Sequence, residues 1–118
     1  MNNRMESCKT FVYDAIKIEE IKRKLPGEDT LLDLSDFFDA MGNPTRLKIL
    51  YALMHGELCT CDLSILTGVS VSAISHQLRI LRDRRIIRYR KDGRNVYYRL
   101  DDEHIMGILK TALTHKGD

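Results

Sequence analysis

The sequence has no long apolar run. No stretch of its 118 residues approaches the ~20 consecutive apolar residues that a membrane-spanning helix needs. The N-terminal segment MNNRMESCKT also lacks the apolar core of a secretion signal, so we expect a cytoplasmic protein with no membrane partner. Internal repeats and low-complexity segments are absent as well. The length predicts one domain over residues 15–118, preceded by a mobile N-terminal arm over residues 1–14.

Cysteine is scarce in this chain. There are three cysteines, an odd number, in a sequence that carries no secretion signal. This combination argues against a disulfide framework. The cysteines are therefore expected to be free thiols or metal ligands.

A strong net charge is lacking too, but the overall value of +2 conceals an asymmetry. Between His76 and Leu100, nine Lys and Arg residues stand against two Asp residues, a local charge of +7 that leaves −5 for the rest of the chain. A merely solvated surface mixes the two signs, whereas a basic patch confined to one segment is the electrostatic footprint of a polyanion partner. Nucleic acid is the expected partner.

The segment from Thr60 to Leu81 predicts two short helices joined by a tight turn. Thr60 is placed to cap the first helix through its hydroxyl, with Leu63 and Leu66 as the inward face. Gly68 stands where a helix commonly ends in a left-handed residue. These features indicate a helix-turn-helix, whose second helix is the candidate DNA-reading element.

The second helix, expected from Ser70 to Arg84, has two different faces. Ser70 is placed to cap it, and apolar residues at i, i+4 and i+7 form a stripe for the core, namely Ile74, Leu78 and Leu81. The opposite stripe is small, polar and cationic, which suits contacts with base edges and phosphates. It comprises Ser72, Ser75, His76 and Arg79. An ordinary helical hairpin with a solvated face is the alternative for this segment alone.

The segment from Ile86 to Leu100 alternates apolar and polar residues on both sides of a Lys91-Asp92-Gly93-Arg94 turn. This is the pattern of a β-hairpin. A helix-turn-helix followed directly by a basic two-stranded ribbon is a winged helix, so the predicted fold class is mainly α with a β-hairpin wing. We expect Arg90, Lys91 and Arg94 to contact the DNA backbone or the minor groove.

Helical periodicity also predicts helices on both sides of these motifs. Residues 15–25 and 29–41 carry apolar stripes, and a last helix follows Asp101 and Asp102. Asn43-Pro44 starts a further helix, because Asn can cap it and Pro is favoured at the first helical position. The terminal apolar stripes can close the core or meet a second copy. We therefore expect dimerisation helices at both ends.

Four segments carry a resemblance to a known family: NPTRLKIL, ELCTCD, SVSAISHQLRIL and the wing RKDGRNVYYRL. Together they resemble the ArsR/SmtB family of metal-sensing repressors, and within it the CadC branch that responds to cadmium and lead. The similarity runs from Cys8 to the C-terminus. It implies a homodimeric transcriptional repressor, not an enzyme, that binds an inverted-repeat operator in double-stranded DNA and leaves it when a metal binds.

Cys59 and Cys61 form the first candidate metal site, with Cys8 as a third ligand. A Cys-x-Cys pair can share a metal where the backbone is extended or just entering a helix, as predicted here. A helix N-terminus favours thiolate, which binds soft ions such as Cd(II), Pb(II), Zn(II), As(III) and Bi(III). The CadC pattern has a second arm cysteine where this chain has Val12, so we expect a three-sulfur site that suits Pb(II) or As(III). Small buried apolar cysteines are the alternative.

The second candidate site comprises Asp102, His104, His115 and Asp118, where Asp118 replaces the Glu usual in the family's C-terminal site. His104 and His115 are 11 residues apart, which places them on nearly the same helix face but ~16 Å apart along the axis. A second, antiparallel copy can bring its own His115 and Asp118 beside Asp102 and His104. Imidazole and carboxylate suit an inter-subunit Zn(II) site. Ordinary surface residues of an amphipathic helix are the alternative.

Two other functions would use some of the same residues. A repressor that senses oxidants or persulfides would have the same fold and react at Cys59 and Cys61. A small zinc hydrolase would use the Asp-x-His cluster near residue 102. The chain offers that reaction no separate general base and little room for a pocket.

Overall fold

The computed structural model describes residues 13–117, so Cys8, Asp118 and most of the predicted N-terminal arm lie outside the described residues. The chain divides into two compact units, Met1–Leu31 and Leu32–Asp118. In the first unit, α2 spans Ala15–Lys24 and is capped by the Asp14 carboxylate, which accepts the Lys17 N–H. No residue of α2 is buried within the chain. The helix α3, Glu28–Met41, begins in this unit and continues into the second.

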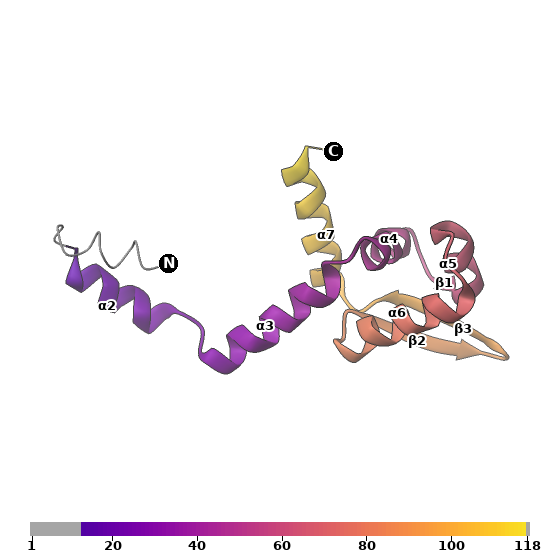
Figure 1. Cartoon of the computed structure of the whole chain (residues 1–118), viewed down its shortest axis with the longest axis horizontal. Coiled ribbons are helices and arrows are strands. Elements are labelled where there is room, and N and C mark those ends of the chain that lie inside the picture. Colours follow the sequence, from indigo (N-terminus) through magenta and orange to yellow (C-terminus); the bar gives the residue numbers. More distant parts are fainter. Residues whose placement is uncertain (1–12, 118) are drawn as a thin grey trace. The chain divides into compact units, whose positions relative to one another are not determined.

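The second unit has the element order of a winged helix (Figure 1). After α3 it contains α4 (Pro44–Leu53), β1 (Leu58–Cys59), α5 (Thr60–Thr67), α6 (Val71–Asp83), β2 (Ile87–Asp92), β3 (Asn95–Leu100) and α7 (Glu103–Lys116). The helices α5 and α6 are the helix-turn-helix, and the β2–β3 hairpin is the wing. In Figure 1 the wing runs alongside α6 to a free tip. The predicted fold class is confirmed.

Most of the predicted helix ends are confirmed. The Asn43 side chain accepts the N–H groups of Thr45 and Arg46, Gly68 ends α5 with φ 73°, and Ser70 caps α6. The cap of α5 was predicted wrongly, because Cys59 and not Thr60 precedes the first helical residue. The reason is a capping box, in which the backbone N–H of Cys59 donates to the carboxylate of Asp62 at 3.1 Å.

The core lies between the four helices α4 to α7, the end of α3 and the sheet. As predicted, α6 buries Ile74, Leu78 and Leu81. Leu66 is 49% exposed, contrary to the prediction, because the short helix α5 turns only Leu63 fully inward. The largest fully buried side chains are Ile49, Leu50, Leu63, Ile74, Leu78, Leu81, Ile86, Ile87 and Leu109.

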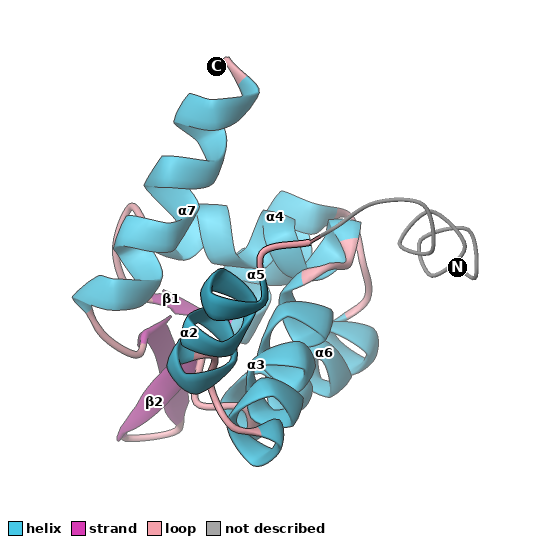
Figure 2. Ribbon diagram, turned by 90° about the vertical axis from the view of Figure 1, so that its left-hand side faces the viewer, coloured by secondary structure: helices cyan, strands magenta, loops and turns pink. Residues whose placement is uncertain are grey.

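The strands form one antiparallel sheet in the order β1-β3-β2, shown in magenta in Figure 2. The wing pairs Ile87 with Leu100 at its base and Asp92 with Asn95 at its tip. Gly93 and Arg94 therefore make the turn, and Gly93 adopts φ 64°. The third strand, β1, was not predicted, since two residues are too short for any periodicity. None of the described helices is long and apolar enough to cross a membrane.

Candidate nucleic-acid interface and metal ligands

The exposed face of α6 carries the polar stripe predicted from the sequence. Ser72, Ser75, His76 and Arg79 together line a shallow hollow of about 230 Å³. All four are exposed, because the opposite face of α6 packs into the core. Hydroxyl, imidazole and guanidinium groups on one accessible helix face can donate hydrogen bonds to base edges and phosphates.

The orientation of α6 is fixed by an arginine that sequence reasoning missed. Arg46 of α4 donates from Nη1 to the Gln77 side-chain oxygen at 2.8 Å. Its Nε donates to the backbone carbonyl of Ala40 at the end of α3. These half-buried hydrogen bonds join three helices, and Gln77 is next to His76 on the candidate interface. The only sequence signal for Arg46 was its place in the NPTRLKIL motif.

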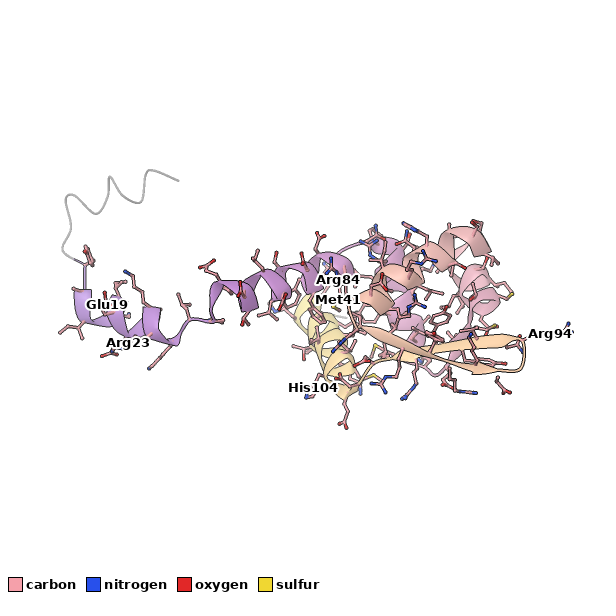
Figure 3. All side chains as sticks on the ribbon, turned by 90° about the horizontal axis from the view of Figure 1, so that it is seen from below. Glu19, Arg23, Met41, Arg84, Arg94 and His104 are labelled. Atoms are coloured by element: carbon pink, nitrogen blue, oxygen red, sulfur yellow. The ribbon has the colours of Figure 1, made fainter. Side chains whose placement is uncertain are left out.

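The cationic side chains of the wing differ in whether they form ion pairs within the chain. Lys91 and Arg94 are exposed at the tip, and neither forms an ion pair within residues 13–117. Figure 3 shows Arg94 projecting from the turn. Arg90, predicted alongside them as a DNA contact, forms two ion pairs within the described chain: its Nη2 lies 2.9 Å from Oε1 of Glu57, and its Nη1 lies 3.7 Å from Oδ2 of Asp92. The hydrogen bond from Arg90 lowers the pKa of Glu57, so this carboxylate stays ionised.

Several other basic residues are paired with carboxylates, which reduces the local excess of positive charge. Arg88 contacts Asp101 at 3.1 Å, and Arg84 contacts Asp36 at 3.6 Å. Arg82 lies 3.9 Å from its neighbour Asp83. The exposed cations of this segment that form no ion pair within residues 13–117 are Arg79 on α6, Lys91 and Arg94 at the wing tip, Arg85 and Arg99. Counting charges along the sequence could not reveal these pairs.

The two described cysteines stand at the start of α5. Cys59 is half-buried, with extended backbone, and Cys61 is exposed in the first helical turn; both are free thiols. The backbone hydrogen bond from Cys59, followed by the bond from its side chain, lowers the pKa of Asp62. Two sulfur donors at a helix N-terminus suit a soft metal ion. Within residues 13–117, no three Cys, His, Asp or Glu side chains are placed together to hold a metal ion.

The structure brings together two of the four residues of the second predicted metal site, Asp102 and His104. Asp102 caps α7, and its Oδ1 accepts the N–H groups of His104 and Ile105. Its Oδ2 lies 3.3 Å from Nδ1 of His104. These bonds, led by the one from Ile105, lower the pKa of Asp102. His115 is in the last turn of the 14-residue helix, ~16 Å along the axis from His104, so one chain cannot join them on one ion.

These features define the class of protein: a winged helix-turn-helix with an exposed polar reading helix and a cationic wing tip. The sequence profile described as bacterial regulatory protein, arsR family, matches residues 43–89. The chain is 39% identical over 114 residues to a transcriptional repressor SmtB homolog from Synechocystis, covering 97% of this chain and 86% of the relative.

Two further comparisons agree. A cadmium resistance transcriptional regulatory protein CadC homolog from Staphylococcus aureus is 36% identical over 112 residues, covering 94% of this chain and 92% of the relative. The crystal structure of the antimony-specific transcriptional repressor AntR superposes with a TM-score of 0.68 at 35% identity, covering 76% of this chain and 82% of that one. The chain belongs to the ArsR family of bacterial regulatory proteins.

Proposed function

We propose that this protein is a metal-responsive transcriptional repressor that binds operator DNA as a homodimer and is released when a soft metal ion binds. One observation carries the proposal: Cys59 and Cys61 occupy the first residues of the helix-turn-helix itself. A metal ion bound there is held by residues that begin α5, the first helix of the helix-turn-helix, and α5 leads directly into the reading helix α6. The names of two relatives support the effector class, since they refer to cadmium resistance and to antimony.

The reading helix α6 enters the major groove in this proposal, with Ser70 at its N-terminus and His76 and Arg79 along its exposed face. Lys91 and Arg94 at the wing tip contact the sugar-phosphate backbone. A two-fold dimer presents two such surfaces, so an inverted repeat with half-sites about one helical turn apart, or a multiple of that, is the matching operator.

Uncovered apolar faces support the dimer. In α2, Ile18 and Ile21 lie on one face of the helix and are 41% and 44% exposed. In α7, Leu113 is exposed and Ile108 is only partly buried. Apolar helix faces of this kind are normally covered by a partner, and a second copy of the chain offers the same faces in return.

The effector site consists of Cys59 and Cys61 with Cys8 as the third sulfur. Three thiolates suit Pb(II) or As(III), whereas Cd(II) and Zn(II) prefer a fourth ligand; Bi(III) also belongs to this soft class. Asp102 and His104, completed by His115 and Asp118 of a second copy, form an inter-subunit site for Zn(II). The contact between Asp102 and His104 supports this pairing, because a carboxylate and an imidazole are already side by side.

The test is operator release. Operator DNA is first selected from a random-sequence pool, and its affinity for the protein is then measured with Pb(II), Cd(II), Zn(II) and As(III). We expect at least one thiophilic ion to weaken binding by 5- to 150-fold, for a coupling of about 1–3 kcal/mol. Thiolate charge-transfer absorbance should appear on binding and be lost in Cys59→Ser. Unchanged operator affinity with every ion would refute the sensor, and reactivity of Cys59 with oxidants alone would indicate a redox repressor.

A further inference from the structure

The thiolate pair and the wing share one sheet. Cys59 on β1 is paired with Tyr97 on β3, and Tyr97 is paired with Arg90 on β2. Directly paired residues of antiparallel strands point to the same face, so Cys59, Tyr97 and Arg90 form one cross-strand row. The Arg90 guanidinium lies over the Tyr97 ring, 4.9 Å from its centre. The row connects a candidate metal ligand to the wing.

Glu57 makes a second contact with Arg90, the outermost residue of this row. It lies two residues before Cys59, so it belongs to the same face as Cys59. Both of its carboxylate oxygens accept from Nε of Arg90, at 3.0 and 3.1 Å, and Nη2 of Arg90 lies 2.9 Å from Oε1. A forked arginine–carboxylate contact fixes direction as well as distance. Glu57 therefore ties the short strand that carries Cys59 to the outer strand of the wing.

We propose that Glu57 and Arg90 are positioning residues that transmit ligation at Cys59 to the wing, so that the wing is the element whose fit to DNA changes. This inference rests on the proposed function. We take the movement on ligation to be a shift of Cys59, the ligand at the end of β1. Since β1 is only two residues long, a shift of Cys59 moves Glu57 with it.

The wing offers a matched control for this connection. Arg88 lies on β2, two residues before Arg90, and forms the same kind of exposed pair with Asp101 at 3.1 Å. Asp101 directly follows β3 and lies outside β1 and the residues that lead into it. Glu57→Gln and Asp101→Asn each remove one negative charge from the partner of a wing arginine, and Arg90 keeps a longer contact with Asp92, 3.7 Å from Nη1 to Oδ2. Any gain in DNA affinity that comes only from the lost negative charge is therefore common to both variants. Exposed ion pairs contribute little to the free energy of folding, so both variants should fold.

The experiment compares wild type, Glu57→Gln, Asp101→Asn and Arg90→Lys as full-length proteins. Cd(II) binding is followed by thiolate absorbance, and operator affinity is measured with and without Cd(II). We expect Glu57→Gln and Arg90→Lys to keep the absorbance band but to reduce the Cd(II)-induced loss of affinity by about 2- to 30-fold. Arg90→Lys keeps the charge and loses only the forked contact, so it separates geometry from charge. Asp101→Asn should behave like wild type.

Three other outcomes would overturn the inference. If Glu57→Gln retains the full Cd(II) response, the contact transmits nothing. If Asp101→Asn loses the response equally, the effect is general electrostatics, and if Glu57→Gln loses the absorbance band, Glu57 acts on metal binding itself. Failure of the proposed function looks different, because wild type would then bind Cd(II) without any change in operator affinity.

Discussion

The salt dependence of operator binding should show whether the two cations at the wing tip, Lys91 and Arg94, contact DNA phosphates. Lys91 and Arg94 are exposed and form no ion pair within the described part of the chain, so both are free to neutralise phosphates. We consider the double substitution Lys91→Gln with Arg94→Gln. Because neither side chain supports the core, the fold should be unaffected, and the loss should be confined to DNA binding.

The magnitude follows from counterion release. Each phosphate contact contributes about −0.9 to the slope of log K against log[salt]. A dimer loses four such cations, so the slope should become less negative by about 3.6. When the salt rises from about 50 to about 200 mM, wild type should lose roughly 150-fold more affinity than the variant does.

Fluorescence anisotropy of labelled operator at four or more salt concentrations gives the slope directly. Arg88→Gln is the control, since Arg88 is on the same strand but is engaged by Asp101 at 3.1 Å. Its slope should stay much closer to that of wild type. Equal slopes for wild type and the tip variant would refute the placement of the wing against DNA, whatever the change in affinity at a single salt concentration.

Three further predictions concern the helix-turn-helix. Leu78→Ala should lower the free energy of unfolding by about 2–5 kcal/mol in urea titrations, because Leu78 is 1% exposed in the core; a change below about 0.5 kcal/mol would contradict the packing. Gly68→Ala should cost about 1–2 kcal/mol, because φ is 73° there, and Gly27→Ala, at a glycine without positive φ, is the comparison. The pKa of Asp62 lies below its ordinary value of 3.8, so its stabilisation is present above that pH and is lost as pH falls through the folded pKa. Asp62→Asn should therefore be less stable than wild type at neutral pH and approach it in acid, and a constant difference at all pH values would argue against the capping box.

The elements that sequence predicted well are those set by local chemistry. The Asn43-Pro44 start and the left-handed Gly68 each depend on residues within a few positions of one another. The same holds for the wing turn, which was predicted over Lys91–Arg94 and comprises only Gly93 and Arg94, because Lys91 and Asp92 belong to β2. The buried stripe of α6 follows from its periodicity. These signals are carried by consecutive residues, so they can be read without knowing the tertiary structure.

The features that escaped prediction depend on distant partners. Arg90 donates a hydrogen bond to Glu57, which is 33 residues away in sequence. Arg46 meets Gln77 across 31 residues. Strand β1 is defined by its pairing with β3, in which Cys59 is opposite Tyr97. The same pairing places a candidate metal ligand in the sheet of the wing.

The most direct test of the account is the Cd(II) affinity of the thiolate pair, measured by its absorbance in competition with a chelator, on free protein and on protein saturated with operator. Linkage requires the two ligands to weaken each other by the same factor. We predict that operator lowers the Cd(II) affinity by the factor by which Cd(II) lowers operator affinity. Identical affinities in the two states for Cd(II), and likewise for Pb(II) and As(III), would contradict a repressor controlled through Cys59 and Cys61.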